Sequence, residues 1–65
     1  MKFLVIYEVF IARLNGDWFT YRDNEVVDFR YHHPTEKELK ELEEKIGKRI
    51  NERVRILYWL PLCND

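Results

Sequence analysis

The feature that most constrains this chain is one amphipathic stretch, Pro34–Asn51. Its apolar residues follow one another at spacings of three, four and four positions, at Leu39, Leu42, Ile46 and Ile50. On a helix of about 3.6 residues per turn these side chains form one narrow stripe, and most other positions in the stretch are charged. Burying each side chain contributes roughly 1.5–3 kcal/mol, so we expect the helix to pack its stripe against the rest of the chain.

Local residues also predict where this helix begins and ends. Thr35 can accept hydrogen bonds as an N-cap, and Glu38 stands three positions later, where a capping box requires it. Gly47 leaves two alternatives, a left-handed cap that ends the helix or an interior position. Because Ile50 continues the apolar stripe, we favour an interior glycine and a helix that ends near Asn51.

The composition limits the class of protein. The chain has 65 residues, of which 46% are hydrophobic and 35% are charged, and its formal net charge is −1. This composition is typical of one folded domain, residues 1–65, and the charge gives no general attraction to nucleic acid or anionic lipid. A chain this short buries only about 60% of the surface that it exposes when unfolded, so a partner would add useful contact area.

The sequence also predicts an intracellular protein without membrane association. The lone cysteine, Cys63, excludes an intrachain disulfide and is typical of a reducing compartment, which we take to be the cytoplasm. Glu8 interrupts the apolar run that follows Lys2, so we interpret these opening residues as a strand and not as a secretory signal. No stretch approaches the roughly 20 apolar residues of a membrane span.

Outside the helix, the sequence predicts four strands. They are Lys2–Arg13, Asp17–Arg22, Glu25–His32 and Val54–Leu60, with Pro61 closing the last. Asn15-Gly16 is a strong signal for a two-residue hairpin turn, and Asp23-Asn24 is a weaker signal for a second turn. The first strand is too uniformly apolar for the edge of a sheet, so we expect it to be central.

These elements predict an α+β fold with the element order β-β-β-α-β. A helix between the third and fourth strands makes the fourth strand parallel to the first. A right-handed crossover then gives a four-stranded mixed sheet of order 4-1-2-3. The single helix covers one face of this sheet and leaves the other face open.

The predicted hairpin register assigns side chains to the two faces. A two-residue turn at Asn15-Gly16 places Arg13 opposite Trp18. Phe10 then lies opposite Tyr21. The face expected beneath the helix, which is the predicted core, carries Phe3, Val5, Tyr7, Val9, Ile11, Trp18, Val27, Phe29, Tyr31, Val54, Ile56, Tyr58 and Leu60.

The opposite face of the predicted sheet carries an aromatic patch with a charged rim. The patch residues are Phe10, Phe19, Tyr21 and Trp59, and the rim residues are Glu8, Asp28, Arg30, Arg53 and Arg55. An aromatic centre inside a charged rim is typical of protein interfaces. We therefore expect these residues to bind a protein partner, either a foreign protein or a second copy in a homo-oligomer. The alternative is a small sheet that keeps some apolar residues on a solvated face.

No residue pattern indicates an enzyme, a cofactor site or a metal site. His32 and His33 are adjacent in an extended segment, where neighbouring side chains point in opposite directions and do not chelate one ion together. Cys63 has no second ligand at a metal-site spacing. The chain contains no serine and only two glycines, which removes serine nucleophiles and glycine-rich phosphate loops.

Single-stranded nucleic acid is an alternative partner for the open face. Aromatic rings and arginines on an open sheet can stack bases and hold phosphates. Glu8 and Asp28 lie on the same predicted face and the chain is net negative, so we rank this partner below a protein. A homodimer whose open faces pair in a purely structural role is a further alternative.

Several fold signals occur together in this sequence. They are the strand-forming opening Met1–Tyr7, the helix start Pro34–Glu36 with Glu38-Leu39 and Leu42-Glu43, and the final strand Val54–Leu57. With these signals the chain resembles the very short proteins encoded by bacteriophages and prophages, although no single family is identified. The resemblance implies an inhibitor that binds a host defence protein stoichiometrically, as anti-CRISPR proteins do, and it implies no particular site residues.

Overall fold

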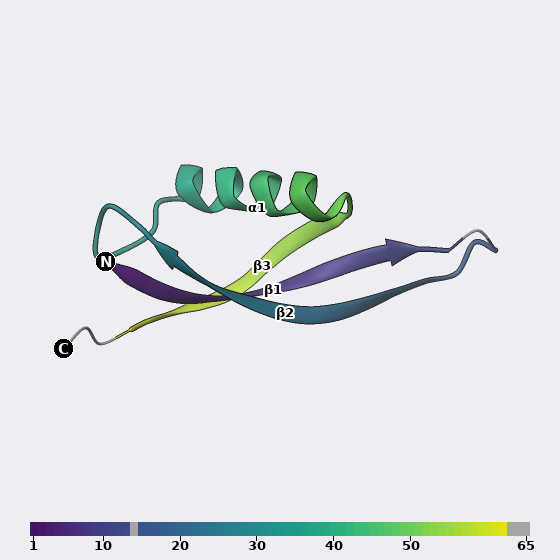
Figure 1. Ribbon diagram of the computed structural model, residues 1–65, viewed down its shortest axis with the longest axis horizontal. Coiled ribbons are helices and arrows are strands. Elements are labelled where there is room, and N and C mark those ends of the chain that lie inside the picture. Colours follow the sequence, from purple (N-terminus) through teal and green to yellow (C-terminus); the bar gives the residue numbers. More distant parts are fainter. Residues whose placement is uncertain (14, 63–65) are drawn as a thin grey trace.

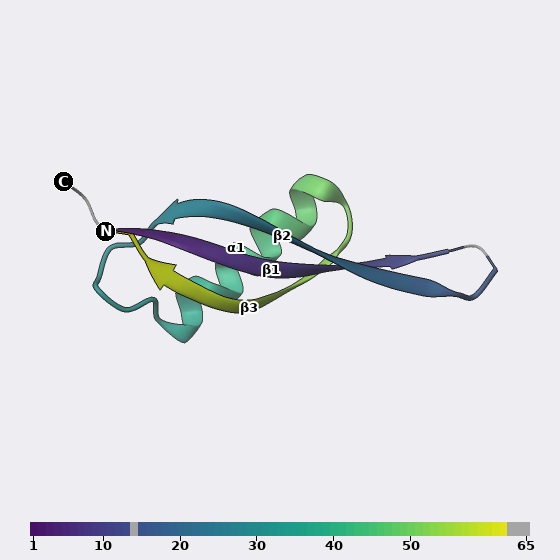
Figure 2. The ribbon, with the colours of Figure 1, turned by 90° about the horizontal axis from the view of Figure 1, so that it is seen from below.

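Figure 1 shows the computed structural model, which describes residues 1–13 and 15–62. Its elements in chain order are β1 (Lys2–Ala12), β2 (Trp18–Asp28), α1 (Glu36–Ile50) and β3 (Arg53–Pro61). The strands form one antiparallel sheet in the order β2-β1-β3, and the helix covers one face of it (Figures 1 and 2). The molecule measures 48 × 20 × 16 Å, because the hairpin of β1 and β2 extends past the helix.

The predicted four-stranded mixed sheet is wrong, although the fold is α+β as expected. The predicted second strand and the first part of the predicted third strand form one strand, β2, and all 11 of its residues pair with β1. Residues 29–32, also predicted as strand, lie in the connection between β2 and α1. The predicted turn residues Asp23 and Asn24 pair instead with Tyr7 and Ile6 in the middle of the ladder. Neither turn residue is a glycine, and β1 is long enough to pair with the whole of β2, so a continuous ladder forms in place of a second hairpin.

The loss of one hairpin reverses the direction of the last strand. β2 brings the chain back to the end where β1 begins, α1 carries it along the sheet again, and β3 therefore runs antiparallel to β1. For this reason the predicted order 4-1-2-3 and its parallel pair are wrong. The expectation of a central first strand is confirmed, since β1 lies between β2 and β3 (Figure 2).

The predicted helix is confirmed at both ends. The Thr35 Oγ1 accepts the Glu38 N–H at 3.1 Å, and a Glu38 carboxylate oxygen accepts the Thr35 N–H at 3.1 Å. The helix continues through Gly47 to Ile50, and Asn51 caps it with a φ of 58°. The hydrogen bond from the Thr35 backbone is the main reason why the pKa of Glu38 lies below its ordinary value.

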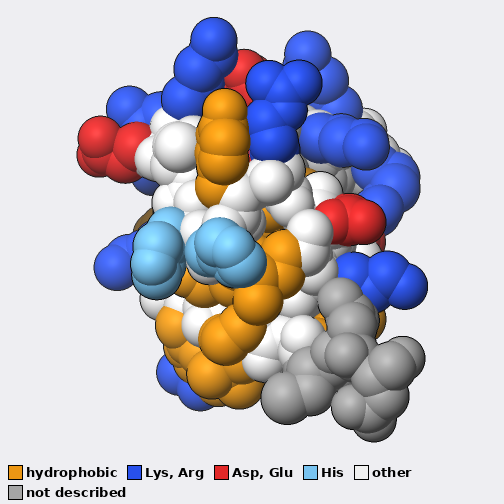
Figure 3. Space-filling view, turned by 90° about the vertical axis from the view of Figure 1, so that its left-hand side faces the viewer, with side chains coloured by type: hydrophobic (Ala, Val, Ile, Leu, Met, Phe, Trp, Pro, Cys, Tyr) orange, Lys and Arg blue, Asp and Glu red, His pale blue; other side chains and the backbone are white. Residues whose placement is uncertain are grey.

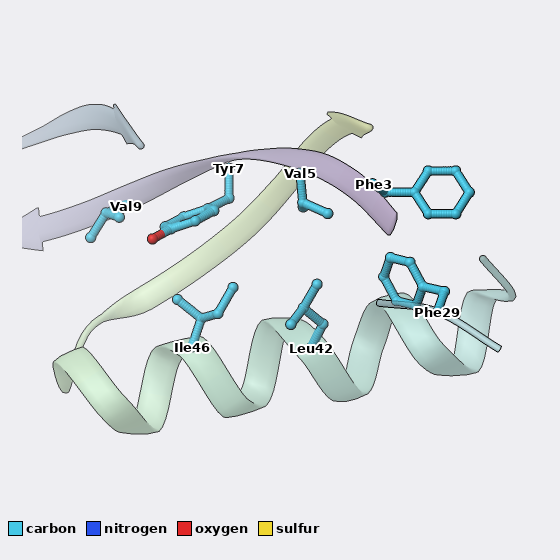
Figure 4. Close-up of a cluster of buried hydrophobic side chains, with 7 residues drawn as sticks. All are labelled: Phe3, Val5, Tyr7, Val9, Phe29, Leu42 and Ile46. Carbon is cyan, nitrogen blue, oxygen red and sulfur yellow. The ribbon is translucent and has the colours of Figure 1, made fainter. Parts of the chain in front are cut away.

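The core lies between α1 and the sheet face beneath it (Figure 4). Its buried side chains are Phe3, Val5, Tyr7, Val9, Phe29, Leu42 and Ile46. Alternate residues of β1 point toward the helix, as the twofold periodicity of a strand requires. Four predicted core residues lie elsewhere, because Trp18 and Tyr31 are 61% and 57% exposed and Tyr58 and Leu60 are 47% and 50% exposed.

An ion pair ties the last turn of α1 to the outer strand β2. The Arg49 guanidinium lies 2.5 Å from the Glu25 carboxylate. Burial raises the pKa of Tyr7 beneath this pair, and the carboxylates of Asp23 and Glu25 raise it further. The helix is therefore held over the sheet by polar contacts at this end as well as by its apolar stripe.

Candidate functional site

The connection between β1 and β2 decides which side chains reach the open face, by which we mean the sheet face opposite α1. Ala12 pairs with Trp18, so the connection consists of residues 13–17. Across it, the Arg13 N–H donates to the Asp17 carbonyl oxygen at 2.7 Å. The predicted two-residue turn and its register are therefore wrong. A shift of one position exchanges the two faces of β2.

A β-bulge has the same effect on β3. Tyr58 pairs with Ile6 and Ile56 pairs with Tyr7, which leaves Leu57 as an extra residue between them. Beyond the bulge, the side chains of β3 consequently lie on the faces opposite to those predicted.

These two shifts divide the predicted aromatic patch between the faces. Phe10 lies on the open face, as expected. Phe19, Tyr21 and Trp59 lie on the helix side, where they remain exposed on the outer strands. The four side chains therefore form no shared surface.

Two of the predicted rim residues lie far from Phe10. Asp28 is at the other end of β2, where its carboxylate accepts a hydrogen bond from the Met1 ammonium group at 2.7 Å. That hydrogen bond is the main reason why the pKa of Asp28 lies below its ordinary value. Arg30 lies in the connection between β2 and α1, and its backbone and charge contribute to the lowered pKa of Glu38.

The open face has an apolar end near the start of β1. We define this apolar end by its residues Leu4, Ile6, Val26, Tyr58 and Leu60. In the register, Leu4 lies between Val26 and Leu60, and Ile6 pairs with Tyr58 in the next row. The exposed fractions of Val26, Tyr58 and Leu60 are 55%, 47% and 50%. No helix or strand in the described part of the chain covers them, so contiguous apolar surface faces solvent.

The other half of the open face combines aromatic rings with arginines. We call it the arginine end and define it by Phe10, Trp18, Arg22, Arg53 and Arg55. The rings of Phe10 and Trp18 have centroids 5.8 Å apart, and the Arg53 guanidinium lies 5.6 Å from the Phe10 centroid. Glu8 lies between Arg22 and Arg55 in the register. Of the predicted rim, Glu8, Arg53 and Arg55 are thus the residues beside Phe10.

Figure 3 views the molecule from the end where β1 begins. Lysine and arginine side chains gather at the top, over the helix, and the two histidines occupy the middle. Hydrophobic side chains form an area below the histidines, on the side away from the helix. This area lies at the same end of the sheet as the apolar end.

Comparison with protein families, with curated proteins and with solved structures gives no significant match to this chain. Among residues 1–13 and 15–62, no three His, Cys, Asp or Glu side chains are grouped so that they could hold a metal ion. The described residues include no helix with the length and apolar character needed to cross a membrane. Cys63 lies outside the residues that the structure describes.

Four residues of the open face were not predicted from the sequence: Trp18, Arg22, Tyr58 and Leu60. The run Ile56–Leu60 consists entirely of apolar residues, so it has no alternation to show which side each residue faces. This loss of alternation was the only signal of the bulge. Trp18 was misplaced only because the hairpin connection is longer than predicted.

Proposed function

We propose that this chain is a protein-binding module that occupies its partner through the apolar end of the open face. The observation that carries the proposal is that Val26, Tyr58 and Leu60 are each about half exposed on the two strands that flank β1, on the face that α1 leaves uncovered. An aromatic and aliphatic surface beside charged residues has the composition of an interface centre. Docking removes from water the apolar area that the helix does not reach.

The size of the chain supports a partner. A domain of about 60 residues buries only about 60% of the surface of its unfolded chain. An antiparallel sheet covered by a helix on one side commonly keeps its other face polar, whereas here that face is apolar at one end and has no layer over it. A docked protein supplies the missing layer.

The class of partner in this proposal comes from the resemblance to short phage proteins. We propose that the partner is a host defence protein in the cytoplasm, which the chain inhibits by stoichiometric occupancy. This action uses binding alone and involves no catalytic group or cofactor of the chain.

Charge substitutions within the apolar end test the proposal. The protein is immobilised, a bacterial lysate is passed over it, and the captured protein is purified and titrated. Tyr58→Glu and Leu60→Glu are expected to weaken binding more than about tenfold, since central interface residues commonly contribute about 2 kcal/mol or more. Tyr31→Glu is the matched control, because Tyr31 is similarly exposed but lies in the connection between β2 and α1.

Two outcomes would contradict the proposal as stated. Equal binding by Tyr58→Glu, Leu60→Glu and the unchanged protein, with all variants folded by circular dichroism, would show that the apolar end does not dock the partner. Light scattering identifies self-association, since a homodimer through this surface becomes monomeric in both variants. That result would identify the partner as a second copy of this chain and not as a foreign protein.

The arginine end favours a second candidate function, binding of single-stranded nucleic acid. Arg53 over Phe10, with Trp18 beside it, can stack a base and contact its phosphate. Glu8 on the same face opposes this function. Titration with a fluorescent oligonucleotide decides between the candidates. Nucleic-acid binding is indicated if the affinity falls steeply with salt. It further requires that Arg53→Gln loses the binding and that Tyr58→Glu retains it. Absence of oligonucleotide binding at low salt would contradict this second candidate function.

A further inference from the structure

We propose that the outer edge of β2, which faces away from β1, receives an extended segment of the partner protein as an additional antiparallel strand. This inference rests on the proposed function, because it states how a partner docked on the open face is held. The edge is 11 residues long, Trp18–Asp28, and no other strand of the described residues pairs with it. An unpaired edge of this kind is a template for strand addition.

The hydrogen bonds between β1 and β2 show which backbone groups are free. The Phe29 N–H donates to the Met1 carbonyl oxygen at 2.8 Å. At the other end, the Arg13 N–H donates to the Asp17 carbonyl oxygen at 2.7 Å. Both of these hydrogen-bonded pairs consist of odd-numbered residues. Bonded pairs alternate with non-bonded pairs in an antiparallel ladder, so the odd-numbered residues of β2 bond to β1 and the even-numbered residues do not. The N–H and C=O groups that point outward from β2 therefore belong to Trp18, Thr20, Arg22, Asn24, Val26 and Asp28.

The opposite edge of the sheet, formed by β3, is blocked. Pro61 has no N–H to donate. The Ile56 N–H is already accepted by the Glu43 carboxylate of α1 at 2.7 Å. Leu57 adds a bulge that bends the strand. Natural sheets protect their edges with such devices, and β2 contains neither a proline nor a bulge.

One local contact occupies part of the β2 edge. The Asp23 Oδ1 accepts the Asn24 N–H at 2.8 Å. This bond joins adjacent residues at an exposed site, so an incoming carbonyl group can replace it and leave the carboxylate in water. Addition of a strand therefore requires no change in the ladder with β1.

A second copy of this chain fits this edge poorly. Twofold antiparallel pairing of two β2 edges places residues of the same face opposite each other. A register centred on Arg22 places two arginines in contact, and one centred on Asp23 places two aspartates in contact. A register centred on Asn24 places Asp23 opposite Glu25. Like charges directly opposite are destabilising, and a register centred outside residues 22–24 pairs at most seven of the 11 residues of β2. Over its whole length the edge therefore fits a foreign segment better than itself.

The side chains of β2 define the chemistry of the incoming segment. On the helix side, β2 presents two aromatic rings followed by two carboxylates, at Phe19, Tyr21, Asp23 and Glu25. The Arg49 ion pair uses Oε1 of Glu25, so the Oε2 atom is the one that can accept a cation from the segment. A matching segment therefore presents lysine or arginine opposite the carboxylates and β-branched residues opposite the rings. On the open face it presents an acidic residue opposite Arg22.

Two synthetic peptides test this edge in the intact protein. The first peptide, with both termini blocked, is Val-Thr-Lys-Thr-Lys-Glu-Val-Thr-Val, which matches residues 19–27 in antiparallel alignment. The control peptide is Val-Thr-Glu-Thr-Glu-Lys-Val-Thr-Val, in which the charges are exchanged. We expect the first peptide to slow hydrogen exchange of the Thr20, Arg22 and Val26 amides about tenfold or more, and to bind about tenfold tighter than the control. The odd-numbered amides of β2, which already bond to β1, remain unchanged.

A proline variant locates the binding to the edge. Thr20→Pro removes an outward N–H without removing a bond to β1, and Thr20→Val keeps that N–H. We expect the proline variant to lose the protection and the valine variant to retain it. The proposal is overturned if the matched peptide leaves exchange of the unchanged protein unaltered, or if both peptides protect equally. Protection of the same amides by self-association without peptide overturns it in favour of a second copy.

The same variants separate this inference from the proposed function. Tyr58→Glu and Leu60→Glu are on β3 and do not alter the backbone edge of β2. Capture of the partner by Thr20→Pro, together with loss of capture by both β3 variants, retains the docking face and overturns strand addition. Loss of capture by Thr20→Pro, with capture retained by Thr20→Val, supports strand addition in the native complex.

Discussion

Gly47 and Asn51 determine how the chain leaves α1. Asn51 adopts the left-handed conformation, and the Glu52 N–H turns back to the Gly47 carbonyl oxygen at 3.1 Å. This turn brings the Glu52 carbonyl oxygen to 2.9 Å from the position that a Cβ on residue 47 would occupy. A glycine inside a helix costs about 1 kcal/mol relative to alanine, so its presence here is explained by the close backbone approach and not by helix formation.

Gly47→Ala is therefore expected to destabilise the protein, although alanine favours the helix. An alanine Cβ would clash with the Glu52 carbonyl oxygen, which is a backbone atom next to the cap of α1. The clash can be relieved only if the turn that connects α1 to β3 moves. Urea unfolding should show a lower midpoint for Gly47→Ala, whereas Lys48→Ala, at an exposed neighbouring position, should stay within about 0.5 kcal/mol of the unchanged protein. A raised midpoint for Gly47→Ala would show that the turn accommodates a Cβ at residue 47 without a clash.

At the scale of elements, the sequence predicts α1 far better than the sheet. The signals for α1 are local: an apolar stripe, a Thr35 cap with Glu38, and an end near Asn51. The strand faces depend instead on the length of the connection 13–17 and on the bulge at Leu57, both of which involve pairing between distant residues. Each shifts the register by one position, and a shift of one position moves a side chain to the other face.

The contact between α1 and β3 gives a prediction at this scale. The Glu43 carboxylate accepts the partly buried Ile56 N–H beside the bulge. Glu43→Ala leaves that N–H without its acceptor and is expected to cost about 1–3 kcal/mol in urea unfolding, with faster hydrogen exchange at Ile56. Glu43→Gln keeps an acceptor oxygen and should recover most of the loss. Unchanged stability and exchange in Glu43→Ala would mean that the bond does not join helix and strand.

At the scale of the whole molecule, one helix covers one side of a three-stranded sheet, and the other side remains open. The α+β class and the central position of β1 could be predicted, because they follow from the helix signals and from the apolar run of β1, which keeps the twofold period of a strand without interruption. Phe10 and Glu8 were placed correctly on the open face for the same reason. Arg53 and Arg55 were also placed correctly, since they precede the bulge in β3. The faces of Trp18, Arg22, Tyr58 and Leu60 could not be predicted, since they depend on the length of the connection 13–17 and on the bulge.

The most direct test of the account is the identity of the residues that pair across β1 and β2, measured by NMR contacts between Hα atoms. Such contacts mark the non-bonded antiparallel pairs, whose Cα atoms approach to about 4.5 Å. The structure predicts contacts between Glu8 and Arg22 and between Phe10 and Thr20. A contact between Ile11 and Thr20 in their place would restore the two-residue turn, exchange the faces of β2 and contradict the open face described for this protein.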